Sequence, residues 1–199
     1  MRGGDYYVNY AAIDEVFIFC ILVNRRSMML ISLKETNNIK QNLIGLEEVK
    51  IYLKIDNNIE DTLLNDLILT AIKNCEECTN ISLGNKNWFA IYKITNHFSE
   101  IILPRKPVHK VIELGGFHYN GKKSKLSDSQ YHLLDNRVIF KQISFFNQIY
   151  IDFNAGYSEQ IPAELKINIF EHIAEMYENR NTSSDFLSKK YNRSRGIKL

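Results

Sequence analysis

The segment IEDTLLNDLILTAIKNCEECT, residues 59–79, decides the fold prediction, because it is the strongest helical pattern in the chain. Its apolar residues recur at the spacing of one broad helix face, and most of its charged residues lie elsewhere. The apolar face consists of Leu63, Leu64, Leu67, Ile68, Ala71, Ile72 and Cys75. Asn58 stands directly before this segment, and Asp61 lies three residues after Asn58. We therefore expect Asn58 to cap the helix.

Two further helices flank this segment at a distance. Residues 46–54 carry Leu46, Val49 and Leu53 on one stripe, with acidic residues in the first turn that favour the helix dipole. Pro162 opens the last helix, residues 162–179, at a position where a missing backbone N–H costs least. Both segments are therefore predicted to pack an apolar face against the helix of residues 59–79.

Between residues 88 and 154 the apolar pattern changes to a period of two, which is typical of strands. Asn120-Gly121 is a strong signal for a hairpin turn. The predicted strands are residues 88–94, 98–103, 108–114, 131–134, 137–141 and 148–154.

The predicted fold class is α+β: a small three-helix bundle with an antiparallel β insertion between the second and third long helices. The main domain spans residues 43–180, and residues 181–199 form a flexible basic tail. No helical or strand period persists in residues 1–42, which are interpreted as an N-terminal extension. This extension is either a docking arm or the product of a wrongly assigned start, with translation beginning at Met28 or Met29.

Composition bounds the class of protein. With 199 residues, 45% hydrophobic and 24% charged, the chain suits one globular domain with an elaboration. A net charge of +2 is too weak to indicate a nucleic-acid-binding protein by itself. The longest apolar run, Val16 to Val23, falls far short of the roughly 20 residues that span a bilayer, so no membrane partner is predicted. Three cysteines favour a reducing compartment over a disulfide framework.

The residues offer no constellation for catalysis. Cys75 and Cys78 form a lone C-x-x-C pair inside a helix, without the two further ligands that a zinc site needs. The histidines are scattered, and Gly115-Gly116 lacks the Lys-Ser/Thr partner of a phosphate loop. We therefore predict no catalytic, metal-binding or cofactor-binding residues, and rank an enzyme last among the possible functions.

Three motifs in order carry a resemblance to a known family. Residues 46–56, LEEVKIYLKID, precede the long helix, and residues 102–108, ILPRKPV, form a proline-flanked basic turn. The third motif joins residues 153–157, FNAGY, with IPAELK at 161–166 and MYENR at 176–180. In this combination the chain resembles the head–tail connector (adaptor) proteins of tailed phages and gene transfer agents, over roughly residues 43–180.

The resemblance implies a structural virion component without an active site. Such an adaptor forms a ring of its own copies, usually a dodecamer, and docks beneath the portal protein. It presents a surface to the next head-completion or tail protein, and double-stranded DNA passes through the channel without sequence-specific contact. The protein is then expected in the virion or phage-like particle, and in the host cytoplasm during assembly, with no cofactor.

Two groups of residues are predicted to serve this assembly. The first lies on the long helix, whose apolar residues are too widely spread for one narrow seam, so that they serve either self-assembly as well as the core or only a central place of this helix in the bundle: Leu63, Leu64, Leu67, Ile68 and Ile72. The second is a basic arm that would order on the portal: Arg180, Lys189, Lys190, Arg193 and Arg195. Non-specific DNA contact and a merely solubilising role remain alternatives for this tail.

A second function from another class stays open. Trp88, Phe89 and Tyr92 could form a platform on which bases stack, together with the basic C-terminal tail. Their alternating spacing is more typical of ordinary packing within a sheet. The alternative function is thus a nucleic-acid-binding module.

Overall fold

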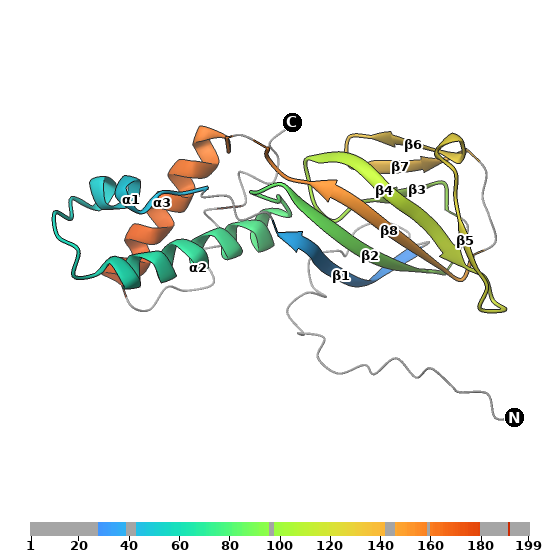
Figure 1. Ribbon diagram of the computed structural model, residues 1–199, viewed down its shortest axis with the longest axis horizontal. Coiled ribbons are helices and arrows are strands. Elements are labelled where there is room, and N and C mark those ends of the chain that lie inside the picture. Colours follow the sequence, from blue (N-terminus) through green and yellow to red (C-terminus); the bar gives the residue numbers. More distant parts are fainter. Residues whose placement is uncertain are drawn as a thin grey trace, which may run out of the picture.

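The computed structural model describes residues 28–38, 43–95, 98–141, 146–158, 160–179 and 191. In chain order the elements are β1 (Met28–Asn38), α1 (Leu46–Leu53), α2 (Asp61–Thr79), β2 (Lys86–Ile94), β3 (Glu100–Ile102), β4 (Val108–Phe117), β5 (Lys123–Lys125), β6 (Tyr131–Leu134), β7 (Arg137–Phe140), β8 (Gln148–Ala155) and α3 (Ala163–Glu178). The helices gather at one end of the longest axis and the strands at the other (Figure 1). We call these two ends the helical lobe (43–79 and 160–179) and the sheet lobe (28–38 and the described residues between 80 and 158).

The sheet lobe consists of two antiparallel sheets. The larger has the order β1-β2-β8-β4-β5, and the smaller has the order β3-β7-β6. Alternate residues of the strands point between the sheets, as in β2, where Trp88, Ala90 and Tyr92 are buried. They meet Ile101 and Val138 of the smaller sheet in one continuous hydrophobic core. The sheet lobe is therefore a packed unit with a core of its own.

The predicted hairpin at Asn120-Gly121 is confirmed. β4 and β5 pair antiparallel, with Phe117 opposite Lys123. The turn closes through hydrogen bonds from the His118 amide to the Lys122 carbonyl and from the Gly121 amide to the His118 carbonyl, both 2.9 Å. Gly121 takes the positive φ, +80°, that such turns require. The hairpin leaves the far end of the sheet lobe, away from the helices (Figure 1).

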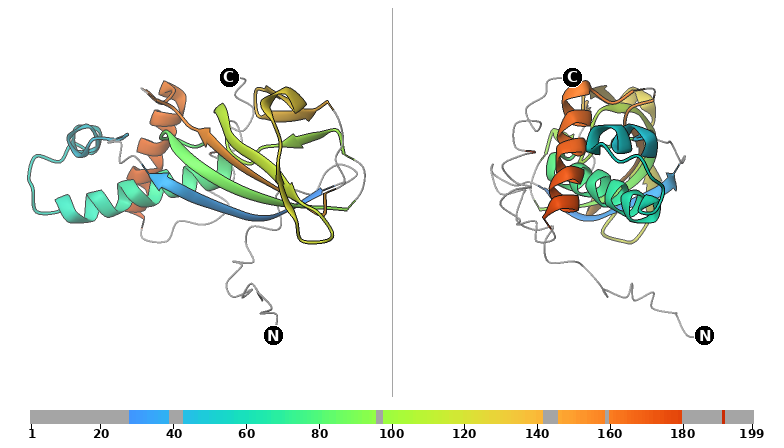
Figure 2. Two further views of the ribbon diagram at one scale, coloured as in Figure 1. Left: turned by 45° about the vertical axis from the view of Figure 1, so that its right-hand side comes forward. Right: turned by 90° about the vertical axis from the view of Figure 1, so that its left-hand side faces the viewer.

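The helical lobe has a separate core. α2 packs against α3, which it crosses at a steep angle, and the short α1 lies against both (Figures 1 and 2). Leu64 of α2 and Leu165 of α3 are fully buried in this core, together with Ile81 and Leu83 from the connection to β2. The three helices begin and end close to the predicted ranges, because each carries a continuous apolar stripe for this core.

The predicted fold class is wrong. The described residues do not form a three-helix bundle carrying a β insertion: eight strands in two antiparallel sheets make up a lobe at least as large as the three helices. β1 also precedes the first helix and pairs with β2, so the large sheet is not confined to the segment between α2 and α3. β1 is an edge strand with four exposed residues at its end, and this weakens the alternation that reveals a strand.

The domain boundaries, including the tail at residues 181–199, stay predictions. Residues 28–38 of the predicted extension form β1, contrary to the expectation that no strand period occurs there. The capping prediction for Asn58 is also wrong. The N-cap of α2 is Glu60, and no side chain caps it. Asn58 instead accepts a hydrogen bond of 2.5 Å from Lys50 Nζ of α1.

A buried polar network joins the two lobes. Glu76, near the end of α2, is 7% exposed, and its carboxylate accepts hydrogen bonds from the Leu83 amide (2.8 Å) and from Lys86 Nζ (2.9 Å). Arg105 is 5% exposed, donates to the Glu76 carbonyl at 3.0 Å and stacks its guanidinium 4.8 Å from the centre of the Trp88 ring. These contacts fix the end of α2 against both the entry into β2 and the segment before β4.

Leu64 provides a test of the helical core. Leu64→Ala should lower the free energy of unfolding by about 2–5 kcal/mol, since it opens a cavity at a fully buried site. Leu69→Ala, on the same helix and 66% exposed, should change it by less than about 0.5 kcal/mol. Urea unfolding followed by circular dichroism measures both. Equal losses for the two variants would show that Leu64 does not occupy the core as described.

Candidate assembly interface

The five residues predicted to serve self-assembly divide between core and surface. Leu64 and Ile68 are buried, and Leu67 and Ile72 are partly buried against the same core. Leu63 is 46% exposed and lies outside it. Their role in self-assembly stays a prediction, with Leu63 as the member that presents most surface.

α2 presents apolar side chains on both of its flanks. Leu63 and Leu69 are six positions apart, which places them roughly 120° apart around a helix of 3.6 residues per turn. The buried face around Leu64 and Ile68 lies on the remaining side. Each flank therefore exposes one leucine, and the two leucines face different directions.

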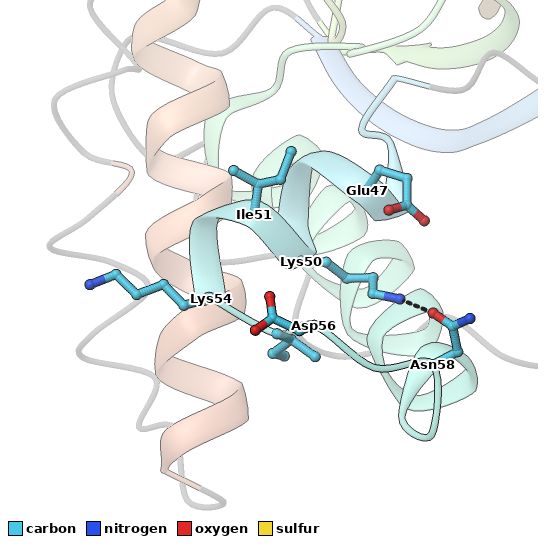
Figure 3. Close-up of a pocket in the computed structure, with 7 residues that line it drawn as sticks. Glu47, Lys50, Ile51, Lys54, Asp56 and Asn58 are labelled. Atoms are coloured by element: carbon cyan, nitrogen blue, oxygen red, sulfur yellow. Dashed lines mark hydrogen bonds between the residues drawn. The ribbon is translucent and has the colours of Figure 1, made fainter.

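A surface pocket of about 500 Å³ opens beside α1. It is lined by Glu47, Lys50, Ile51, Lys54, Ile55, Asp56 and Asn58. Lys50 is 5% exposed, and its ammonium is held by Asn58 and by Asp61 at 3.0 Å, so its charge is already compensated. Figure 3 shows Lys54 extending in the opposite direction from Lys50. Ile51, which is 78% exposed, adds an apolar side chain to a lining that also holds the acidic residues Glu47 and Asp56.

The tip of the β4–β5 hairpin carries the most exposed aromatic side chain of the described residues. Tyr119 is 80% exposed. Lys122, Lys123 and Lys125 follow it and are all exposed. Lys123 lies over the Tyr150 ring at 4.2 Å and 3.7 Å from Glu113. The tip therefore presents an exposed aromatic side chain close to several lysines.

Charge divides unevenly between the lobes. The helical lobe contains twelve acidic and four basic residues, a net charge of −8. The described part of the sheet lobe contains six acidic and eleven basic residues, a net charge of +5. The small net charge of the whole chain hides this separation, because opposite charges gather at opposite ends of the molecule.

The aromatic platform considered for nucleic acid is not available as a unit. Trp88 and Tyr92 are each 6% exposed, in the core between the sheets. Trp88 donates its Nε1–H to Ser82 Oγ at 3.3 Å, and the Tyr92 hydroxyl donates to the Ile102 carbonyl at 3.0 Å. Phe89 points to the other face of the sheet and stacks on Tyr150, with ring centres 6.2 Å apart. The interpretation of these residues as sheet packing is the one that the structure supports.

The predicted tail residues Arg180, Lys189, Lys190, Arg193 and Arg195 lie outside the described residues. Tyr191, which the sequence analysis did not single out, is fully buried in the helical core. Its hydroxyl hydrogen-bonds with Nδ1 of His172 at 3.0 Å, and burial lowers the pKa of His172 to about 4. No periodic pattern surrounds Tyr191 in the sequence, so only its contacts reveal it.

The cysteine pair behaves as part of the core. Burial raises the pKa of the Cys75 thiol to about 12, which keeps it protonated and unreactive at neutral pH. Among the described residues no group of three His, Cys, Asp or Glu side chains is placed to hold a metal ion. Within the same ranges, none of the helices is both long and apolar enough to cross a membrane.

Comparison with known proteins identifies chains of similar structure and a matching family. A search of curated proteins found no significant match. Among solved structures, a chain in the neck of an empty gene transfer agent particle with C6 symmetry is 19% identical and superposes with a TM-score of 0.67, over 85% of this chain and 97% of the other.

Two further solved structures are similar, both with a TM-score of 0.64 and 19% identity. One chain comes from the virion of a native gene transfer agent particle, with 84% of this chain and 96% of the other covered. The other comes from the neck of a native particle with C12 symmetry, with coverage of 85% and 97%. At this identity the likeness shows a shared fold.

The sequence model of the family described as "Phage gp6-like head-tail connector protein" matches residues 43–197. This range contains the three motifs on which the resemblance was based, and the resemblance is confirmed. This chain belongs to the phage gp6-like head–tail connector protein family.

Proposed function

We propose that this protein forms a ring that docks on the portal as a head–tail adaptor and links it to the next connector or tail protein. Membership of a head–tail connector family carries the proposal, because the match spans residues 43–197. A connector acts by its surfaces, which argues against a catalytic role. The protein would then reside in the virion and assemble in the host cytoplasm.

Two observations support a ring. The similar chains come from particle necks with C6 and C12 symmetry, which agrees with six or twelve copies around an axis, and we favour twelve. A ring also needs two different, mutually complementary surfaces on each subunit, since its contacts are heterologous. The exposed Leu63 and Leu69 on opposite flanks of α2, and the opposite charges of the two lobes, provide such asymmetry.

Genome passage requires a channel that does not grip phosphates, because each lysine or arginine contact adds salt-dependent affinity for DNA. α3 suits such a wall: it carries four glutamates, and Lys166 is its only basic residue. Lys166 is itself paired with Glu48 of α1 at 2.6 Å. We propose that α3 faces the channel, where its negative charge would let duplex DNA slide without sequence-specific contact.

The proposal is tested by electron microscopy and mass photometry of the full chain, alone and mixed with its cognate portal protein. We expect annular particles in at least one of the two samples. Absence of annular particles from both would contradict the proposal. A monomer that binds short oligonucleotides tightly and with strong salt dependence would instead favour the nucleic-acid-binding module.

A further inference from the structure

We propose that neighbouring copies of this chain join by inserting the β4–β5 hairpin tip of one copy into the α1 pocket of the next. The inference rests on the proposed ring and names the contact that would build it. Tyr119 is the projection, and the pocket beside Ile51 and Ile55 receives it.

The two surfaces match in shape and polarity. Tyr119 exposes 80% of its surface at the end of a narrow hairpin, and Ile51 exposes 78% of its surface at the pocket. Exposed apolar groups of this size are typical of interaction sites when they gather at a concave or projecting feature. The tyrosine ring can cover the isoleucines while its hydroxyl donates to a carboxylate of the pocket, such as Asp56.

The charges of the two surfaces are also complementary. Lys122 stands beside Tyr119 on the tip, and Glu47 and Asp56 stand at the pocket. Two lysines also line the pocket, but neither opposes an incoming lysine strongly. Asn58 and Asp61 already hold the ammonium of Lys50, and Lys54 extends away from Lys50 and Asn58 (Figure 3). The two whole lobes are complementary as well, since the sheet lobe carries a net charge of +5 and the helical lobe a net charge of −8.

A second copy of the chain is the occupant that these observations favour. The β4–β5 hairpin and α1, which lines the pocket, lie at opposite ends of the longest axis (Figure 1), so one copy cannot satisfy both by itself. Contacts between opposite ends are heterologous, and they close into a ring when the rotation between neighbours divides a full turn. A stable interface buries roughly 800 Å² on each partner, so the tyrosine acts as its central anchor within a wider contact.

Cross-linking tests the contact directly. Two single variants of the full chain, Tyr119→Cys and Ile51→Cys, are mixed under the conditions that give rings and treated with a short bifunctional maleimide. We expect a covalent dimer containing one copy of each variant, identified by the linked peptides in mass spectrometry. The parent chain reports any reaction of the native cysteines. In the matched control, Leu134→Cys takes the place of Tyr119→Cys in the mixture with Ile51→Cys. Leu134 is 59% exposed and lies on β6, so this mixture should give no such dimer.

A charge exchange between the two surfaces tests the same contact without a cross-linking reagent. Lys122→Glu should weaken association at low salt by about tenfold, and Asp56→Lys should do likewise. Combining the two substitutions in one chain should restore association, because the charges are then exchanged and still opposite. Lys110→Glu, which reverses another exposed lysine of the sheet lobe, serves as the control and should leave association almost unchanged.

The outcomes separate this inference from the proposed function. Rings without the mixed cross-link, or with equal cross-linking in the Leu134→Cys control, would overturn the contact and leave the ring standing. Rings unaffected by Lys122→Glu, together with loss of salt-sensitive binding to duplex DNA, would assign the hairpin to DNA and also overturn it. Absence of rings in every sample would overturn both.

Discussion

Gly156→Ala is expected to prevent folding, or to lower the free energy of unfolding by more than about 4 kcal/mol, the range reached by few single substitutions. Gly156 follows β8, where the chain leaves the sheet lobe for α3, and its φ is +119°. A Cβ atom built there would lie 1.9 Å from the backbone oxygen of Gly84, which no side-chain rearrangement can relieve. Soluble yield and the urea midpoint of any folded fraction measure the effect.

The matched control is Gly121→Ala in the β4–β5 hairpin. Gly121 also has a positive φ, +80°, but nothing lies within 4 Å of its Cβ position. Its replacement should therefore cost only the backbone strain, about 1–2 kcal/mol. Similar losses at the two glycines would show that the crowding at Gly84 does not govern this connection.

Glu76→Ala is expected to lower the free energy of unfolding by about 3–5 kcal/mol, because it breaks a buried charged network by removing one partner. The buried Leu83 amide loses its acceptor, and Lys86 is left with the more distant carboxylate of Glu35, at 3.5 Å. Arg105 stays buried without the nearby carboxylate that favours its charged form. Urea unfolding measures the loss, and Glu76→Gln should lose less because its amide oxygen can still accept a hydrogen bond.

The adjacent residue on α2 provides the control. Glu77 is half exposed and forms an ion pair with Lys73 of the same helix, at 3.9 Å. Ion pairs of this exposed kind contribute about 0–1 kcal/mol, so Glu77→Ala should change stability little. If both variants lost the same amount, the stabilising role assigned to the junction would be refuted.

Local pattern was sufficient for most secondary structure. The helices and six of the eight strands of the described residues lie close to their predicted positions, because apolar periodicity records which side of each element is buried. The hairpin at Asn120-Gly121 followed from turn chemistry alone. The order of three short motifs was enough to identify the family.

Pattern was insufficient where an element depends on a distant partner. β1 was not predicted, because this strand is stabilised by its pairing with β2 at one edge of the sheet. Asn58 has the chemistry of a helix cap, but the buried ammonium of Lys50 takes its side-chain oxygen. The predicted fold class was wrong for a related reason, because strand periodicity does not show that the strands assemble into two sheets with a separate core.

The candidate interface shows the same division. By itself the sequence determined that α2 is apolar over a broad face, that the hairpin turns at Asn120-Gly121, and that the chain resembles the head–tail connector family. Only the tertiary structure decided that Leu64 faces inward and Leu63 outward, that Tyr191 enters the helical core, and that the pocket and the hairpin tip lie at opposite ends. Burial and charge compensation arise from contacts between residues far apart in the chain, and a pattern of neighbours carries no record of them.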